Sequence, residues 1–155
     1  MSWPEPVERV SAALKAAAVD AHIEQFEESA ATAREAARAV GADLSQIVKS
    51  IVLVADGAYV LVLVPGDRRA DEAAVKNALS AQEIRVATAD EVRHATGFEP
   101  GGVAPFPQRA IAHTLMHKAL LEHEVVWVGA GTEQHMASLS PADLARLARA
   151  RAFHA

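Results

Sequence analysis

Helical spacing of apolar residues predicts a first helix near the start of the chain. Val7, Val10, Leu14 and Ala18 recur three to four positions apart within Pro6–Val19. This spacing places them on one face of a helix, which is typical of a helix that packs on a core.

Two capping boxes mark the starts of further helices. Thr32-Ala-Arg-Glu35 begins a helix that is expected to end at Gly41, and Thr88-Ala-Asp-Glu91 begins one expected to end at Gly97. In such a box the threonine hydroxyl accepts from an early backbone N–H while the glutamate reaches back to the cap. Other helical segments are predicted over Ala70–Leu79, over a turn at Lys118–Glu122, and after Ser140-Pro141-Ala-Asp143, which supplies a cap, a first-position proline and an acidic first turn.

Two β-rich apolar runs predict a hairpin in the middle of the sequence. Ile47–Ala55 and Tyr59–Val64 flank Asp56-Gly57, and Asp-Gly suits a type I′ turn because both central residues need positive φ. The runs are almost continuously apolar, as in strands covered on both faces. Shorter extended segments or strands are predicted at His22–Glu27, Arg85–Ala87, Ile111–Thr114, Val125–Gly129 and Met136–Leu139. Thr96–Pro107 holds three glycines and three prolines, so a rigid loop is expected there.

Interspersed helices and strands with an antiparallel hairpin indicate a mixed α/β fold with helices around a central sheet. The length of 155 residues and mass of 16.4 kDa fit one domain, predicted over residues 1–155. With 51% hydrophobic and 23% charged residues the composition is globular.

Composition excludes several kinds of chemistry. There is no cysteine, so disulfides, thiolate metal sites and cysteine nucleophiles are absent. The net charge of −5 argues against a broad basic face for duplex binding, although a local basic patch stays open. The N-terminus lacks a basic and apolar leader, and no apolar run reaches membrane-spanning length. We therefore expect a cytoplasmic protein without a membrane partner.

Three segments could carry chemistry. Lys49 stands among apolar residues of a predicted strand, either as a lysine whose stem snorkels at the strand edge or as a cation facing a phosphate or carbonyl oxygen. The loop Gly97–Pro105 is either a surface turn or a set of backbone N–H donors for an anion or oxyanion. In Gly129–His135, a glycine pair ends a strand and a histidine follows.

Other motifs are not supported. His113 and His117 have the spacing of metal ligands on a helix, but the HExxH pattern is absent, and we predict no metal or other cofactor. No G-x-S-x-G elbow occurs. If the protein is a hydrolase, water is therefore expected to attack the substrate directly.

Three ordered blocks resemble the YbaK and prolyl-tRNA synthetase editing-domain family, whose members are aminoacyl-tRNA deacylases. The first block is Thr32–Gly41 followed by Gln46-Ile-Val-Lys-Ser-Ile51. The second is Thr96-Gly-Phe-x-x-Gly-Gly-Val-x-Pro105. The third is Val126-Trp-Val-Gly-Ala-Gly131 with Leu139-Ser-Pro-Ala-Asp-Leu144. The resemblance covers roughly residues 21–147, and it implies a compact fold with a mixed, partly barrel-like sheet.

The resemblance also implies a site. Lys49 matches the family's characteristic lysine, and Gly101, Gly102 and His135 match positions of its loop and last pocket segment, so these four are the expected catalytic residues. His117 stands where many members have an acidic residue. Substrate-binding positions are expected at Phe26, Thr32, Ser50, Phe98, Val103, Gly129 and Gly131.

The function implied is trans-editing, in which water hydrolyses the ester of a mischarged tRNA and backbone N–H groups stabilise the oxyanion. Either the terminal ribose hydroxyl of the tRNA or His135 would activate the water. The implied partners are the tRNA acceptor end and an aminoacyl-tRNA synthetase, and a homodimer is open. The alternatives are a silent relative that binds aminoacyl-tRNA or a synthetase, and a hydrolase of small acyl esters. Alanine, cysteine, serine, proline and threonine all remain open as the amino acid removed.

Overall fold

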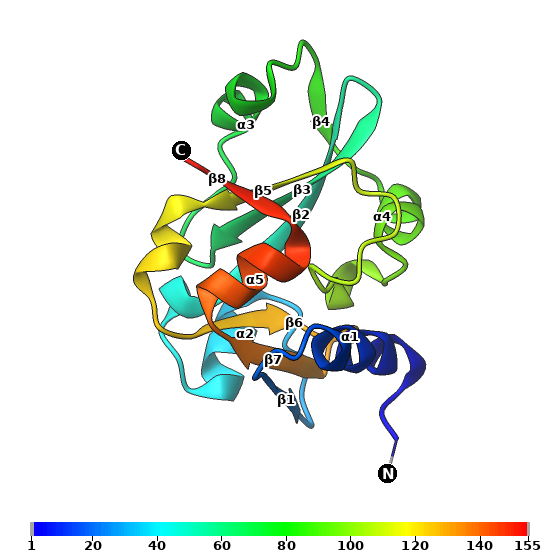
Figure 1. Cartoon of the computed structure of the whole chain (residues 1–155), viewed down its shortest axis with the longest axis vertical. Helices are drawn as coiled ribbons and strands as arrows, with labels where there is room; N and C mark the ends of the chain where they lie inside the picture. Colours follow the sequence, from blue (N-terminus) through cyan, green and yellow to red (C-terminus); the bar gives the residue numbers. More distant parts are fainter. Residues whose placement is uncertain (1, 155) are drawn as a thin grey trace.

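The computed structural model describes residues 2–154, which fold around two β-sheets (Figure 1). The larger sheet has the order β4-β2-β3-β5-β8, formed by Ile84–Val86, Val48–Ala55, Ala58–Pro65, His113–His117 and Ala150–Phe153. β2 pairs antiparallel with β3 and β4, whereas β3–β5 and β5–β8 are parallel. This mixed pairing confirms the predicted α/β class.

The smaller sheet is antiparallel and has the order β1-β7-β6. Its strands are His22–Gln25, His135–Leu139 and Val126–Gly129. One isolated parallel bridge between Ile47 and Trp127 joins it to the larger sheet just before β2 begins. The expected central sheet is thus divided into two hydrogen-bonded parts that meet at the start of β2.

Between residues 2 and 154, five α-helices surround these sheets, and three 3-10 turns connect the elements. The helices are α1 Glu5–Ala16, α2 Ala33–Val40, α3 Glu72–Leu79, α4 Ala89–Thr96 and α5 Pro141–Ala148, and the turns are η1 Leu44–Gln46, η2 Pro100–Gly102 and η3 Lys118–Glu122. Both expected capping boxes are present, and Gly41 and Gly97 end their helices in the left-handed conformation. Figure 1 places α3 and β4 at one end of the molecule and α1, β1 and β7 at the other.

The β2–β3 hairpin forms as predicted. Asp56 and Gly57 have φ values of 48° and 82°, as a type I′ turn requires. Eight residue pairs then run in register from Ala55–Ala58 to Val48–Pro65.

Several predicted bounds were wrong. The first helix ends at Ala16 rather than Val19, because Ala18 is left-handed with φ 54°. The strand predicted over Ile111–Thr114 is β5, His113–His117, so the two histidines lie on a strand and not on a helix. β8 was not predicted: Arg149 is left-handed with φ 53°, which ends α5 and turns the chain into a parallel strand.

Each face of the larger sheet packs on its own apolar cluster. One face meets α3 through residues such as Leu53, Val64 and Val75. The opposite face, which includes Val48 and Val52, packs against the main core. Because side chains alternate along a strand, Lys49 belongs to the first face and Ser50 to the second.

Candidate active site

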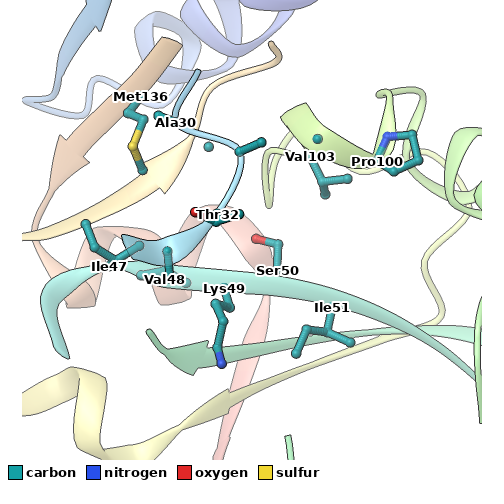
Figure 2. Close-up of a pocket in the computed structure, with 14 residues that line it drawn as sticks. Ala30, Thr32, Ile47, Val48, Lys49, Ser50, Ile51, Pro100, Val103 and Met136 are labelled. Atoms are coloured by element: carbon teal, nitrogen blue, oxygen red, sulfur yellow. The ribbon is translucent and has the colours of Figure 1, made fainter. Parts of the chain in front are cut away.

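A cavity with a volume of about 370 Å³ opens beside the first half of β2 (Figure 2). β4 pairs with β2 only at Leu53–Ala55, so no strand of the described chain pairs with this side of Val48–Ile51. Segments distant in sequence close the space. The lining residues are Ala30, Ala31, Thr32, Ala33, Ile47, Val48, Lys49, Ser50, Ile51, Pro100, Gly101, Val103, Gly129 and Met136.

The exposed edge of β2 presents backbone groups to this cavity. The Ile47 carbonyl accepts from Gly66 N on the β3 side, whereas the Val52 carbonyl accepts from Ala87 N on the β4 side. In an antiparallel strand the N–H and C=O of one residue point the same way and alternate with those of the next. The N–H and C=O of Ser50 are therefore directed toward the cavity, whereas the same edge is bridged to Trp127 at Ile47.

Ser50 adds an unsatisfied hydroxyl. Its Oγ is buried and has no hydrogen-bond partner in the described chain. Buried polar groups normally have such a partner, and an exception points to strain or to an absent ligand. Figure 2 shows this side chain directed toward the side of Thr32 and Val103, while Lys49 points the opposite way.

The start of α2 forms another wall. Glu35 N donates to Thr32 Oγ1 at 3.1 Å, and Thr32 N donates to Glu35 Oε1 at 3.2 Å. This box fixes Ala31–Ala33 at the cavity and turns the positive end of the helix toward it. Developing negative charge is favoured at such a place.

Lys49 borders the cavity from the other sheet face. Burial lowers the pKa of its ammonium, Asp67 opposes this shift, and Arg69 adds to it. The lysine is therefore a partly desolvated cation, whose interaction with a phosphate or oxyanion is stronger than in bulk water.

The glycine loop contributes Gly101 and Val103 to the lining, but not Gly102. Gly102 N–H donates to the Glu99 carbonyl at 2.8 Å, and the residue packs against Gly131. A Cβ on Gly129 would collide with the Val103 carbonyl. Glycine at 129 thus lets the loop lie directly against β6.

His135 is not brought to the cavity. Its neighbour Met136 lines the cavity, and alternate side chains of a strand face opposite ways. The imidazole is buried, its Nδ1 bonds the Thr132 hydroxyl, and its ring meets Trp3 edge-on at 5.5 Å. Burial lowers its pKa, and Nε2 has no partner in the described chain.

The predicted positions fall into two groups, those that line the cavity and those that pack elsewhere. Thr32, Lys49, Ser50, Gly101, Val103 and Gly129 line the cavity. Phe26 packs behind it in a cluster with Ile47 and Met136. Phe98 is in the main core beneath the Arg9 guanidinium, 4.6 Å from its ring centroid. Gly131, with φ 112°, packs against the backbone at the start of α1.

Sequence reasoning missed Glu133. Its carboxylate lies beside Gly101, where Oε1 would be 2.7 Å from an added Cβ. The Ser29 hydroxyl donates to Glu133 Oε2 at 3.4 Å, and Ala30 N donates to the Glu133 carbonyl at 2.6 Å. A carboxylate therefore stands next to the cavity, although nothing in the exposed segment around it marked this residue.

Within residues 2–154, no three histidine, aspartate or glutamate side chains converge as a metal site. In the same range, no helix is both long and apolar enough to cross a membrane.

The described chain thus has an α/β fold with a cavity at the open edge of a mixed sheet. Residues 27–147 match the family model described as the aminoacyl-tRNA editing domain. The chain therefore belongs to the aminoacyl-tRNA editing domain family.

Two individual relatives illustrate the sequence similarity. The chain is 44% identical over 77 residues to the proline–tRNA ligase of Bacillus licheniformis, covering 50% of this chain and 14% of that ligase. It is 30% identical over 126 residues to the uncharacterized protein YwhH of Bacillus subtilis, covering 79% of this chain and 78% of that protein.

A solved structure extends the similarity to the whole fold. It is described as that of a candidate trans-editing enzyme for prolyl-tRNA synthetase, and it aligns with a TM-score of 0.91 and 32% identity over 99% of both chains.

Proposed function

We propose that this protein is a trans-editing deacylase that hydrolyses the ester bond between a wrong amino acid and the 3′ end of a tRNA. The observation that carries the proposal is the buried, unpartnered Ser50 Oγ at the cavity beside the open edge of β2. Membership of the editing-domain family and the similarity to a proline–tRNA ligase support it.

The substrate ester would lie along the open strand edge. Ester hydrolysis places negative charge on the carbonyl oxygen, and the groups directed at the cavity are the Ser50 hydroxyl, the Ser50 backbone N–H and the start of α2. One preorganised donor to such an oxyanion typically lowers the activation free energy by about 2.7–4 kcal/mol. Lys49 would hold the terminal phosphate or this oxygen.

Water activation is assigned to the substrate. The His135 ring is directed away from the cavity and bonded to Thr132, so it would not act as the base. The terminal ribose hydroxyl of the tRNA would position the attacking water beside the ester carbonyl.

Glu133 would recognise the amino group of the substrate. An aminoacyl ester carries a free α-amino group that is largely cationic near neutral pH. The Glu133 carboxylate beside Gly101 supplies the opposite charge at the same side of the cavity. The proposed partners are thus a mischarged tRNA, held by its acceptor end, and a synthetase that releases it, with prolyl-tRNA synthetase the first to examine.

A deacylation panel tests the proposal. Proline tRNA is charged in turn with alanine, serine, cysteine, proline and threonine, and the ester remaining is followed with and without the protein. Hydrolysis of one or two of these, exceeding that of the free aminoacyl esters, is expected. Equal turnover of free esters would favour a small-ester hydrolase, and tRNA binding without hydrolysis would favour a binding module.

A further inference from the structure

A second cavity, with a volume of about 370 Å³, lies at the ends of β5 and β8. Four of its lining side chains are basic or imidazole groups, and one is acidic. The lining consists of Arg68, His117, Lys118, Ala119, Leu121, Glu122 and His154. The whole chain has a net charge of −5, so this gathering of basic and imidazole groups is local.

His117 has an unmet hydrogen-bonding need in this cavity. Its side chain is 5% exposed, and its Nδ1 accepts from Ala119 N at 3.0 Å. A neutral imidazole whose Nδ1 accepts carries its proton on Nε2. That Nε2 lies 3.4 Å from Arg68 Nη1, and a guanidinium can only donate. Two donors therefore face each other, and an anionic oxygen between them would accept from both.

The charges around the imidazole match this interpretation. Burial lowers the His117 pKa most, Arg68 and His154 lower it further, and Asp67 and Glu122 act in the opposite direction. Lys118 adds another cation to the cavity wall. The cationic form of His117 is disfavoured until a negative group enters.

The strand register connects this cavity to the proposed active site. Lys49 pairs with Val64 on β3, and Leu63 pairs with Met116 on β5, so the next residues, Val64 and His117, are neighbours. Lys49 and His117 thus lie on one sheet face two strands apart, which is about 10 Å. The basic groups of the two cavities, Lys49 in one and Arg68 with His117 in the other, therefore lie near each other on this face, with the buried Val64 between Lys49 and His117.

We propose that the cavity at Arg68 and His117 binds a backbone phosphate of the tRNA whose acceptor end occupies the editing cavity. The Arg68 guanidinium and His117 Nε2–H would donate to the phosphate oxygens, with Lys118 as a further cation. The inference rests on the proposed function for the identity of the nucleic acid. Beyond the proposed function, this phosphate site would fix the direction in which the tRNA strand runs from the ester at its 3′ end.

Binding of uncharged proline tRNA to the full chain tests the inference separately from hydrolysis. Arg68→Gln and Lys118→Gln change exposed side chains, and Lys76→Gln on α3 is the matched control. We expect each of the first two to weaken binding about three- to tenfold, and to reduce the slope of log affinity against log salt by about 0.7–1. The control should leave both quantities unchanged.

NMR titration of His117 supplies a second readout. Adding the tRNA acceptor stem should raise the His117 pKa, because a phosphate stabilises the imidazolium. If wild type binds tRNA and Arg68→Gln and Lys118→Gln bind as tightly with the same salt slope, the inference is wrong while the proposed function stands. If inorganic phosphate shifts His117 and the acceptor stem does not, the cavity takes free phosphate and the inference is also wrong. If wild type neither binds nor deacylates tRNA, the proposed function itself fails.

Discussion

Lys49 and Ser50 are adjacent in sequence and face opposite sides of β2. Within residues 2–154 the buried Ser50 hydroxyl at the cavity has no hydrogen-bond partner, and Lys49 carries a partly desolvated ammonium near Asp67 and Arg69. The strand edge between them exposes backbone donors and acceptors. Under the proposed function, Ser50 would contact the ester, and Lys49 would contact the terminal phosphate or the developing oxyanion of the same substrate.

Ser50→Ala should reduce deacylation without reducing stability. The hydroxyl makes no hydrogen bond within the described chain, so its removal costs no internal bond, whereas loss of one preorganised donor to the oxyanion typically raises the barrier by about 2.7–4 kcal/mol. We expect kcat/KM to fall about 10²- to 10³-fold and the urea midpoint to stay unchanged or to rise. Ser11→Ala, a buried serine on α1, is the control for activity. Unchanged kcat/KM in Ser50→Ala would remove the hydroxyl from the mechanism.

Glu133→Gln tests recognition of the substrate amino group. Removing the negative charge should raise KM for an aminoacyl-tRNA about fivefold, because an exposed ion pair contributes up to about 1 kcal/mol. An N-acetylated substrate has no such cation, so wild type and variant should hydrolyse it equally. A similar loss on both substrates would show that Glu133 acts by supporting the Gly101 loop instead.

The two buried histidines predict a pH dependence of stability. Burial lowers the pKa of His135 and of His117 in the folded chain, so below about pH 6.5 the unfolded chain binds more protons. The free energy of unfolding should therefore fall as the pH drops from about 7.5 to 5.5. Urea denaturation across this range measures the fall, and His135→Gln should make it shallower. A fall of the same size in His135→Gln would contradict the assignment.

Residue-level features were only partly predictable from the sequence. Lys49, Ser50 and Thr32 line the cavity as expected, because they sit in or beside a strand and helix with strong local signals. His135 and Gly102 do not, since strand alternation and a backbone bond to Glu99 decide where they point. Neither fact can be read from a motif.

At the scale of elements, α2 and α4 form a natural comparison. Both begin with a threonine capping box, and the hydroxyls accept from N–H groups at 3.1 Å and 3.2 Å. Thr32 borders the cavity, whereas Thr88 is not among the residues that line it. The same local structure thus occurs with and without a proposed functional role.

Thr32→Ala and Thr88→Ala should separate folding from function. Each substitution removes a cap and should lower the free energy of unfolding by about 1 kcal/mol. Thr32→Ala alone should also lower deacylation, because it loosens the wall that directs the start of α2 at the ester. Urea unfolding and single-turnover hydrolysis measure the two effects. Equal activity loss in both variants would mean that stability, and not the cavity wall, explains the effect.

Element prediction succeeded where the signal is local. The capping boxes and the Asp56-Gly57 turn each depend on a few adjacent residues. β8 escaped prediction because Arg149 is a left-handed residue that is not glycine, and because its strand is defined by parallel pairing with distant β5.

At the scale of the whole molecule, the site exists because two sheets meet at the start of β2. Ile47 bridges Trp127 of the smaller sheet, and β4 leaves the adjoining edge of β2 unpaired. Residues near positions 30, 50, 101, 129 and 136 then surround one cavity. Such long-range convergence follows from topology. The candidate residues named from the sequence include several that line the cavity, but neither Met136, which lines it, nor Glu133 beside it was among them.

The central claim is that this cavity hydrolyses the ester of a mischarged tRNA. The most direct test is single-turnover hydrolysis, by excess protein, of proline tRNA that has been mischarged with alanine. Wild type and Lys49→Ala are compared side by side, and circular dichroism checks that both are folded. We predict that the wild-type protein hydrolyses the ester well above the spontaneous rate. The rate constant of Lys49→Ala should be lower by a factor of at least about 10, which corresponds to a barrier higher by about 1.4 kcal/mol. Hydrolysis that is no faster than the spontaneous rate with any charged amino acid of the panel, or equal in the folded Lys49→Ala variant, would contradict the claim.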